Sequence, residues 1–290
     1  MSVLSTERQD VWLVDGGGQA PPAAPAELRR NGRGWSVVVT DQALRDPVTS
    51  DELARLALNG ARLLRPRDHY EQTRRRAMLD DVDESWFLFD RPLRRRPVYT
   101  AIKAAVDLLA GMAGSLLALF LLPFVWLIYR LSDGGPVFYR QERIGLRGRP
   151  FQIWKFRTMR VDAEAEGPVW ASADDERVTR LGRLLRSTHL DELPQFFNVL
   201  RREMSLIGPR PERPVFVRLL GRAIPFFDRR HLVRPGVTGW AVVRFGYSDS
   251  VRDKWIIHEY DLYYLKHRSV PLDLEIIART ILVMLTRKGQ

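Results

Sequence analysis

A long uncharged stretch, residues 108–129, limits more than any other feature what this chain can fold into. About 20 apolar residues suffice to cross a bilayer as a helix, so length alone predicts a spanning helix. Pro123 interrupts that helix after Leu122, because proline lacks the backbone donor of a helix interior. Basic residues crowd both ends of the stretch, whereas a spanning helix carries them mainly on one side. They are Arg91, Arg94, Arg95, Arg96 and Lys103 before it, and Arg130, Arg140, Arg143, Arg147 and Arg149 after it.

Two topologies fit these observations. A segment that enters the membrane, breaks between Leu122 and Pro123 and returns to the same face accounts for both the proline and the charges. An ordinary kinked transmembrane helix accounts for the length equally well, so residue chemistry leaves both open. The first residues lack a basic region followed by an apolar one, and we therefore expect no cleavable signal peptide and cytoplasmic soluble parts.

Composition excludes several kinds of site. With 290 residues, 45% of them hydrophobic, the chain can form one sizeable domain and a smaller one. It has no cysteine, which excludes disulfides and thiolate metal sites, and its five histidines form no H-E-x-x-H pair. Any metal should therefore be a hard cation bound by oxygen. A formal net charge of +11 predicts an anionic partner: nucleic acid, an acidic membrane surface or a phosphorylated substrate.

The part that precedes the apolar stretch divides in two. Residues 1–34 contain three consecutive glycines and a Pro/Ala-rich run, which predicts a flexible arm. Residues 35–97 contain an apolar run at Val37, a helical pattern at 49–59 and a second short apolar run at Leu63 and Leu64. This pattern indicates a small β/α module with a basic linker. It contains no catalytic cluster, so a structural or regulatory role is expected.

The part that follows the apolar stretch, residues 131–290, holds alternating and helical patterns. Two short strands are expected on either side of a turn at 145–150. Helices are expected at about 174–186 and 192–200. The C-terminal segment is apolar but carries Asp273, Glu275 and Arg279, so it fits either an amphipathic helix at the membrane interface or a buried core helix.

The segment around Asp191 and Glu192 carries the clearest chemical signal. Pro194 has no amide hydrogen and is tolerated only in the first turn of a helix, which predicts that both carboxylates lie at a helix N-terminus. Neighbouring residues on a helix point about 100° apart, so the pair cannot share one proton as a facing dyad does. Separate roles, such as nucleophile and metal ligand, are expected; simple helix capping by acidic residues is the alternative.

Basic residues elsewhere could grip phosphates. Strand alternation predicts Lys155 and Arg157 on one face of the second strand, roughly 7 Å apart. Arg210 lies between Pro209 and Pro211, which restricts its backbone and lowers the entropy lost when the guanidinium binds an anion. Solvated cations on a strand and a plain proline-rich loop are the alternatives. The sequence VRPGVTGW, from Val233 onward, is a turn that could approach a ligand closely or merely reverse the chain.

Taken in order, these features resemble the bacterial sugar transferase family, the monotopic polyprenyl-phosphate phosphoglycosyl transferases of capsule, O-antigen and exopolysaccharide synthesis. The resemblance covers about residues 98–290. It rests on the apolar segment interrupted at Pro123 and on the sequences YRQERIG, KFRTM, LDELPQ, SLIGPRP, RPGVTGW and DLYYLKHRS. Residues 35–90 also look like the latter part of the Rossmann-like module that precedes the catalytic domain in larger members, whose four earlier transmembrane helices have no counterpart here.

The resemblance implies a membrane-anchored fold of the mixed α/β (α+β) class. Its parts would be a partial Rossmann-like β/α module, a re-entrant helix-break-helix at 98–130, and a compact, mostly helical catalytic domain at 131–290. That domain would include a small β-hairpin and an interfacial C-terminal helix. Both ends of the re-entrant helix would lie on the cytoplasmic face of the inner membrane, with the break satisfied by protein groups.

The resemblance also implies the reaction, the transfer of a sugar 1-phosphate from a UDP-sugar to polyprenyl (undecaprenyl) phosphate. In such enzymes the carboxylate that matches Asp191 attacks the β-phosphate, releases UMP and carries the phosphosugar until the lipid phosphate takes it. Mg²⁺ would be bound by Asp191 and Glu192. By similarity, phosphates would be bound by Lys155, Arg157 and Arg186, and the nucleotide by Pro209, Arg210, Pro211 and Gln195.

Two rival functions differ in class. A nucleic-acid-binding protein would explain the net charge and the eight tryptophans, but not the uncharged stretch, and the chain has no basic recognition helix or RNA-binding signature. We therefore expect no nucleic-acid partner. A catalytically inactive membrane scaffold of a polysaccharide assembly complex would retain the same motifs. The identity of the sugar and the oligomeric state, a homodimer included, are left open by the sequence.

Overall fold

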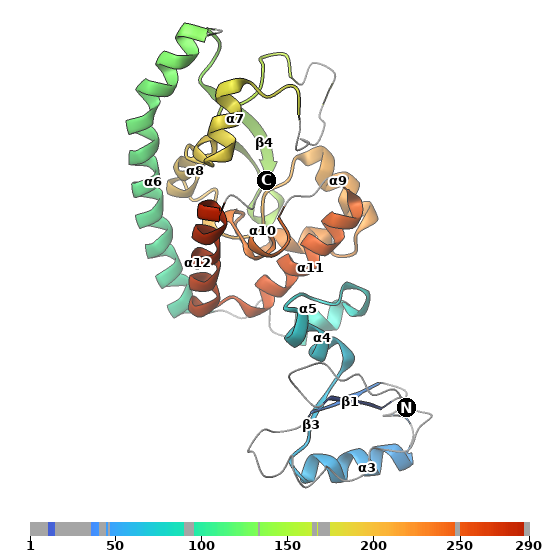
Figure 1. Ribbon diagram of the computed structural model, residues 1–290. Helices are drawn as coiled ribbons and strands as arrows, with labels where there is room; N and C mark the ends of the chain where they lie inside the picture. The colour runs from blue at the N-terminus through green and yellow to red at the C-terminus, as the bar shows by residue number, and fades with distance from the viewer. Residues whose placement is uncertain are drawn as a thin grey trace. The chain divides into compact units, whose positions relative to one another are not determined.

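The computed structural model describes residues 11–14, 36–40, 45, 47–89, 96–132, 134–163, 167, 175–246 and 250–286. The chain divides into two compact units, Met1–Asp81 and Val82–Gln290, which combine helices with small sheets (Figure 1). The sequence placed this boundary later, after residue 97. The difference arises because α5 (Glu84–Phe89) belongs to the second unit, where Trp86 is fully buried and the ring of Phe87 lies 5.2 Å from that of Phe226.

The first unit is a small parallel sheet with helices. Its strands are ordered β1-β2-β3, and α3 connects β2 to β3 as the crossover that parallel neighbours require. Val37, Val39, Leu53, Leu56 and Ala61 form its core. The predicted helix and second strand are thereby confirmed. The elements are β1 (Val11–Val14), β2 (Ser36–Val39), α3 (Pro47–Leu58), β3 (Arg62–Leu64), α4 (Pro66–Arg74) and the 3-10 turn η1 (Leu79–Asp81).

Strand β1 corrects one prediction. Residues 11–14 fall within the expected flexible arm, yet they pair in parallel with all four residues of β2. The apolar sequence VWLV suits a strand, and its pairing covers an edge of β2 that would otherwise expose unpaired backbone groups. The remainder of the predicted arm lies outside the described residues.

The second unit is built around α6 (Pro97–Ser132), a helix of 36 residues. Among the residues that the structure describes, it is the one helix long and apolar enough to cross a membrane. The break predicted between Leu122 and Pro123 is not seen, because α6 continues through the proline (Figure 1). An internal proline removes one backbone hydrogen bond, a loss that a helix supported along one side can absorb by bending.

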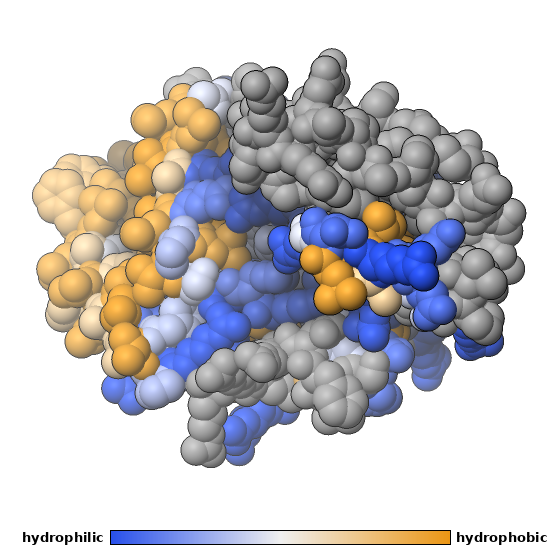
Figure 2. All heavy atoms as spheres, turned by 90° about the horizontal axis from the view of Figure 1, so that it is seen from below, coloured by the Kyte–Doolittle hydropathy of each residue, from blue (hydrophilic) through white to orange (hydrophobic). Residues whose placement is uncertain are grey.

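The two sides of α6 differ. Its buried residues recur at helical spacing and are mostly small or polar near the middle: Asp107, Gly111, Gly114, Ser115, Ala118, Val125 and Tyr129. Its other side exposes large apolar residues: Leu108, Leu109, Met112, Leu116, Leu117, Leu119, Phe120, Phe124, Trp126, Leu127, Ile128 and Leu131. Figure 2 shows hydrophobic side chains gathered on the α6 side of the molecule. This helix therefore presents its apolar side outward, the reverse of a helix on a soluble domain.

An antiparallel hairpin follows α6. Strands β4 (Phe138–Ile144) and β5 (Pro150–Phe156) pair along their full length, from Phe138 opposite Phe156 to Ile144 opposite Pro150. The turn between them contains the 3-10 segment η2 (Leu146–Gly148), in which Arg147 and Gly148 both have positive φ. The two strands and the glycine-containing turn predicted from the sequence are thus confirmed.

The rest of the unit is mostly helical. Its elements are α7 (Arg180–Ser187), η3 (Leu190–Glu192), α8 (Gln195–Leu200), β6 (Ser205–Ile207), α9 (Pro214–Ala223), η4 (Phe227–Leu232), β7 (Gly236–Thr238), α10 (Trp240–Arg244), α11 (Val251–His267) and α12 (Val270–Thr286). Helix α7 begins later than predicted, because the Thr179 side chain accepts a hydrogen bond from the Gly182 amide and so caps the helix there.

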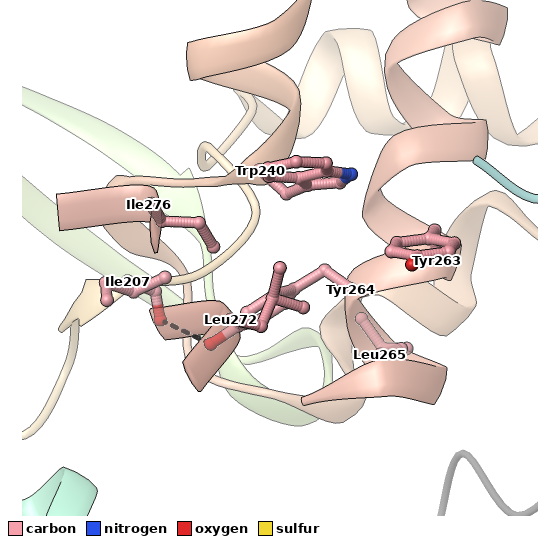
Figure 3. Close-up of a cluster of buried hydrophobic side chains, with 7 residues drawn as sticks. All are labelled: Ile207, Trp240, Tyr263, Tyr264, Leu265, Leu272 and Ile276. Atoms are coloured by element: carbon pink, nitrogen blue, oxygen red, sulfur yellow. Dashed lines mark hydrogen bonds between the residues drawn. The ribbon is translucent and has the colours of Figure 1, made fainter. Parts of the chain in front are cut away.

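The C-terminal half has its own apolar core. Ile207 of β6, Trp240 of α10, three residues of α11 and two of α12 gather in it: Tyr263, Tyr264, Leu265, Leu272 and Ile276 (Figure 3). The Tyr264 hydroxyl donates a hydrogen bond to the Ile207 carbonyl across this core, at 3.5 Å. Beyond it, α12 exposes Leu274, Ile281, Leu282, Met284 and Leu285. Helix α12 therefore buries one side of its first half, while the membrane-interface alternative stays a prediction.

Candidate active site

The carboxylates Asp191 and Glu192 lie in the 3-10 turn η3, between α7 and α8. His189, in the left-handed backbone region, ends α7, and Pro194 is the residue immediately before α8. The predicted helix start is thus displaced by three residues, since a tighter 3-10 turn separates the carboxylates from α8. Leu190 and Leu193, on either side of the pair, pack against a buried cluster at the C-terminal end of α6, which anchors the turn.

Glu192 is held between two cations. Its Oε1 lies 2.7 Å from the Lys155 ammonium nitrogen and 2.6 Å from a guanidinium nitrogen of Arg210. A second Arg210 nitrogen lies 3.4 Å from Oε2, so the contact is two-pronged. Burial opposes ionisation of this carboxyl, but Arg210 and Lys155 prevail and hold the pKa of Glu192 well below its usual range. Glu192 is therefore ionised and joins strand β5 to the Arg210 loop.

Asp191 has a different environment. Its side chain is buried, and no described residue donates a hydrogen bond to it. Burial raises the pKa of Asp191 to about 6; Lys155, Arg186 and Arg210 counteract this effect, and the neighbouring charge of Glu192 adds to it. Two adjacent carboxylates thus differ in kind: Glu192 is occupied by ion pairs, whereas Asp191 keeps its oxygens available within reach of three cations.

The Arg210 loop is fixed at its backbone. An Arg230 guanidinium nitrogen donates to the Arg210 carbonyl at 2.8 Å and also forms a buried ion pair with Asp261 at 2.7 Å. Arg143 donates to the Pro211 carbonyl at 2.9 Å. The next residue, Glu212, pairs with Lys254 at 2.6 Å. These buried pairs hold the loop so that the Arg210 side chain reaches Glu192.

Glycines bring the loop close to its neighbours. Strands β6 and β7 pair in parallel, and a Cβ atom at Gly208, Gly236 or Gly239 would overlap backbone atoms of the facing segment. The Gly208 amide donates to the Thr238 carbonyl, and the Gly236 amide donates to the Pro209 carbonyl, each at 2.9 Å. The VRPGVTGW turn thus serves close backbone packing beside the Arg210 loop.

A small hollow opens beside this loop. It is partly open to solvent and is lined by Ile144, Pro209, Arg210, Pro211, Arg230, His231, Val233 and Pro235. Burial lowers the pKa of His231 to about 4, an effect that Arg230 reinforces, so its imidazole is neutral at physiological pH. The hollow is apolar on its proline and aliphatic sides and cationic at Arg210.

Three further predicted residues lie at or near the site with different contacts. Arg186 donates to the Thr158 hydroxyl at 3.0 Å, and its charge acts on Asp191. Gln195, at the start of α8, is buried, and its Nε2 has no acceptor among the described residues. Arg157 packs against the C-terminal end of α6. It is 4% exposed, donates to the Pro136 carbonyl at 2.7 Å and stacks on the Tyr129 ring.

The sequence did not predict the buried residues that hold the Arg210 loop in position. No role was predicted for the buried partners Arg143, Arg230, Lys254 and Asp261, although Arg143 and Asp261 lie in the sequences YRQERIG and DLYYLKHRS, because sequence spacing does not reveal contacts across the fold. Asp107, a carboxylate on the buried side of α6, was also missed. In that case a signal existed: an acidic residue at the border of a long uncharged stretch is costly unless it has partners.

The chain is similar to several known proteins. Residues 98–287 match the family described as Bacterial sugar transferase. The UDP-N-acetylgalactosamine-undecaprenyl-phosphate N-acetylgalactosaminephosphotransferase of Aeromonas hydrophila is 40% identical over 259 residues, which are 88% of this chain and 60% of the relative. A UDP-glucose:undecaprenyl-phosphate glucose-1-phosphate transferase of Escherichia coli (strain K12) is 38% identical over 196 residues, 67% of this chain and 42% of the relative.

A third relative is shorter. The UDP-glucose:undecaprenyl-phosphate glucose-1-phosphate transferase of Caulobacter vibrioides is 41% identical over 203 residues, 67% of this chain and 76% of the relative. The chain therefore spans 60% of the Aeromonas relative and 42% of the Escherichia relative, but three quarters of the Caulobacter one. The matches share the region that contains α6 and the Asp191 turn.

Proposed function

Because this chain belongs to the bacterial sugar transferase family, we propose that it transfers a sugar 1-phosphate from a UDP-sugar to polyprenyl phosphate and releases UMP. The transfer would be the initiating step of exopolysaccharide, capsule or O-antigen synthesis. The names of the relatives support this reaction class, since each describes transfer to undecaprenyl phosphate. They differ in the sugar, which is N-acetylgalactosamine in one and glucose in the others.

The environment of Asp191 is the main chemical support for this proposal. Asp191 is a buried carboxylate to which no described residue donates a hydrogen bond, and it lies among Lys155, Arg186 and Arg210. A nucleophile must keep a lone pair free, and a diphosphate needs cations to offset the repulsion between two anions. Glu192 is already ion-paired and is therefore unsuited to attack. Asp191 would act as the nucleophile, while Glu192 holds Lys155 and Arg210 in place beside it.

The reaction proceeds in two displacements in this proposal. An Asp191 oxygen attacks the β-phosphorus of the UDP-sugar, the bond from that phosphorus to the bridging oxygen breaks, and UMP leaves with the electron pair. An oxygen of polyprenyl phosphate then attacks the same phosphorus, and the bond to Asp191 breaks. The carboxylate is restored, and the product is a polyprenyl diphosphate sugar.

The residues present fit a Mg²⁺ ion that takes most of its ligands from the substrate. The described residues contain no group of three or more carboxylates or histidines that could enclose a metal. Mg²⁺ commonly uses one or two carboxylates together with phosphate oxygens and water. We propose that Asp191 and Glu192 are the protein ligands, with Glu192 binding through Oε2, whose contact with Arg210 is the longer one at 3.4 Å. When bound, the ion would neutralise charge on the transferring phosphates.

The loop of Pro209, Arg210 and Pro211 supports nucleotide binding. Prolines and aliphatic side chains line the hollow beside it, and the Arg210 guanidinium that lines the same hollow also contacts Glu192. We propose that the uridine lies here, with its diphosphate directed towards Lys155, Arg186 and Arg210. Gln195 would contribute from α8. Arg157 is assigned no phosphate contact, since it is buried against Tyr129.

The membrane arrangement follows from α6. Both halves of this helix contact the same unit: Asp107 accepts hydrogen bonds from β6 residues, and Tyr129 stacks with Arg157. A helix covered by a polar unit along its whole length cannot thread a bilayer, so we propose that its apolar side enters one leaflet and both its ends remain on the cytoplasmic face of the inner membrane. Pro123 is then the position where α6 can bend, because it leaves the Leu119 carbonyl without its helical donor.

Turnover by the purified protein tests the proposal. In detergent with Mg²⁺ and polyprenyl phosphate, the wild type should release UMP from at least one nucleotide sugar in a panel that includes UDP-N-acetylgalactosamine and UDP-glucose. Asp191→Asn should reduce the rate by at least about 10³-fold, because the amide is not a nucleophile. The same change at Asp162, whose side chain is 76% exposed, is the matched control and should leave the rate within twofold. Undiminished UMP release by Asp191→Asn would refute the assignment.

A further inference from the structure

The buried face of α6 carries a carboxylate, Asp107, whose partners lie in strand β6. Its Oδ1 accepts a hydrogen bond from the Leu206 amide at 2.9 Å and lies 2.9 Å from the Ser205 hydroxyl. Asp107 is 7% exposed and Ser205 is 1% exposed. The Ser205 hydroxyl is also 3.0 Å from the Ile207 carbonyl, but it has one hydrogen, and a carboxylate is the stronger acceptor.

Strand β6 leads directly into the Arg210 loop. Leu206 precedes Arg210 by four residues, and the Gly208 and Pro209 backbones between them are hydrogen-bonded to the β7 segment. A shift of β6 along or away from α6 would therefore move the Arg210 guanidinium relative to Glu192, with which it makes a 2.6 Å contact. The loop is fixed on its far side by Arg143 and Arg230, so Asp107 supplies the support from the membrane-facing side.

We propose that Asp107 is a positioning residue for the nucleotide donor: from within the apolar helix it fixes β6, and thereby sets Arg210 at the donor's phosphates. The inference rests on the proposed function for the identity of the donor. The physical basis is the cost of a carboxylate in an apolar helix, which is offset here by two donors that also belong to the strand carrying the loop. A stability role alone would not require its partners to lie in that strand.

The kinetic test separates donor from acceptor. Asp107→Ala removes the charged acceptor of both the Leu206 amide and the Ser205 hydroxyl, and should raise KM for the UDP-sugar about tenfold. KM for polyprenyl phosphate should stay within twofold, because the lipid phosphate reacts after UMP has left and the loop is then no longer in use. Asp107→Asn keeps an oxygen acceptor of the same shape and should restore the donor KM to within about threefold of the wild type.

Ser115 provides the matched control. It is a second polar residue on the same buried side of α6, two turns after Asp107, and its hydroxyl has no partner among the described residues. Ser115→Ala should leave both KM values unchanged. If Asp107→Ala raises both KM values equally, or lowers kcat alone, a general loss of folding accounts for the effect and the positioning role is overturned.

The variant Ser205→Ala and a hydrogen-exchange measurement test the positioning role independently of KM. Ser205→Ala removes one partner, and a double-mutant cycle with Asp107→Ala should give less than the sum of the two effects, because the residues share one interaction. Hydrogen exchange at the Leu206, Gly208 and Arg210 amides should accelerate at least tenfold in Asp107→Ala but not in Ser115→Ala. If hydrogen exchange is unchanged in Asp107→Ala, the positioning role is overturned, whether or not the wild type releases UMP. If the wild type releases no UMP, only the proposed function is overturned.

Discussion

Adjacent residues in η3 acquire opposite character from their surroundings. Asp191 and Glu192 are both carboxylates in one short turn, but Lys155 and Arg210 are ion-paired to Glu192 only. Asp191 is left buried, without a hydrogen-bond donor from the described residues, and its pKa is raised to about 6. Such a group is ionised at neutral pH and yet less stabilised than an ion-paired one, which are the two properties required of an attacking carboxylate.

The raised pKa of Asp191 predicts an acidic limb in the pH profile. Only the ionised carboxylate can attack, so kcat/KM should fall as the pH drops below about 6 and level off above about 7, because this ratio reports the free enzyme. Lys155 counteracts the rise in the pKa of Asp191, and Lys155→Met should move the limb to higher pH. The exposed cation Arg183 gives the control, and Arg183→Met should leave the limb in place. If Lys155→Met does not move the acidic limb, the limb reports the ionisation of a group other than Asp191.

Much of this site was predictable residue by residue, and the exceptions have physical causes. Pro194 marks the carboxylate turn, and proline-flanked Arg210 marks the loop, because proline restricts the backbone locally. Arg157 was placed on a strand face with Lys155, but β5 ends at Phe156, so alternation no longer applies to it. The long-range partners of the loop, among them Arg230, could not be found, since no local pattern reports a contact made across the fold.

At the scale of elements, the contact between α6 and α8 determines where the carboxylates lie. Gly111 and Gly114 let α8 approach α6 closely. A Cβ atom at Gly111 would overlap Leu200 of α8, and one at Gly114 would overlap Phe196. Helix α8 follows the Asp191 turn after two residues, so α8 joins that turn to the apolar helix. The sequence predicted both helices but not their contact, because small residues in an apolar helix equally suit packing and lipid exposure.

Gly114→Ala tests this joint. The added methyl group overlaps the Phe196 ring, so we expect a loss of about 1–3 kcal/mol in the free energy of unfolding and a drop in UMP release of at least tenfold. Gly221→Ala is the matched control, because Gly221 lies in helix α9 with open space around its Cβ position. It should be neutral or slightly stabilising, as alanine favours a helix. Thermal unfolding and turnover measured on both variants decide; equal behaviour of the two would contradict the close-packing account.

At the scale of the whole molecule, the two sides of helix α6 have different environments. The buried side of α6 carries Asp107, glycines and Tyr129 towards the catalytic unit, while leucines and aromatics cover its outer side. The exposed apolar end of α12 adds to that surface. The length of the uncharged stretch, its proline and its flanking charges left two topologies open. The structure adds that one side of the helix packs against the rest of the second unit, from Asp107 to Tyr129.

Single-cysteine labelling tests the resulting topology. The chain contains no cysteine, so Arg55→Cys and Arg149→Cys, both on exposed positions, introduce one thiol each on the two sides of α6 in sequence. A membrane-impermeant maleimide should label both in inside-out vesicles and neither in intact right-side-out vesicles. Labelling after detergent lysis is the control for reactivity. Labelling of the two positions from opposite sides would restore a spanning helix.

The central claim, that Asp191 carries the sugar phosphate between two displacements, is tested most directly by the mass of the enzyme itself. Incubated with Mg²⁺ and its UDP-sugar but no lipid acceptor, the protein should release about one UMP per molecule and gain the mass of one sugar phosphate on the peptide that contains Asp191. Polyprenyl phosphate should then remove that mass, and Asp191→Asn should never acquire it. UMP release that occurs only with the acceptor present, with no gain in protein mass, would contradict the account.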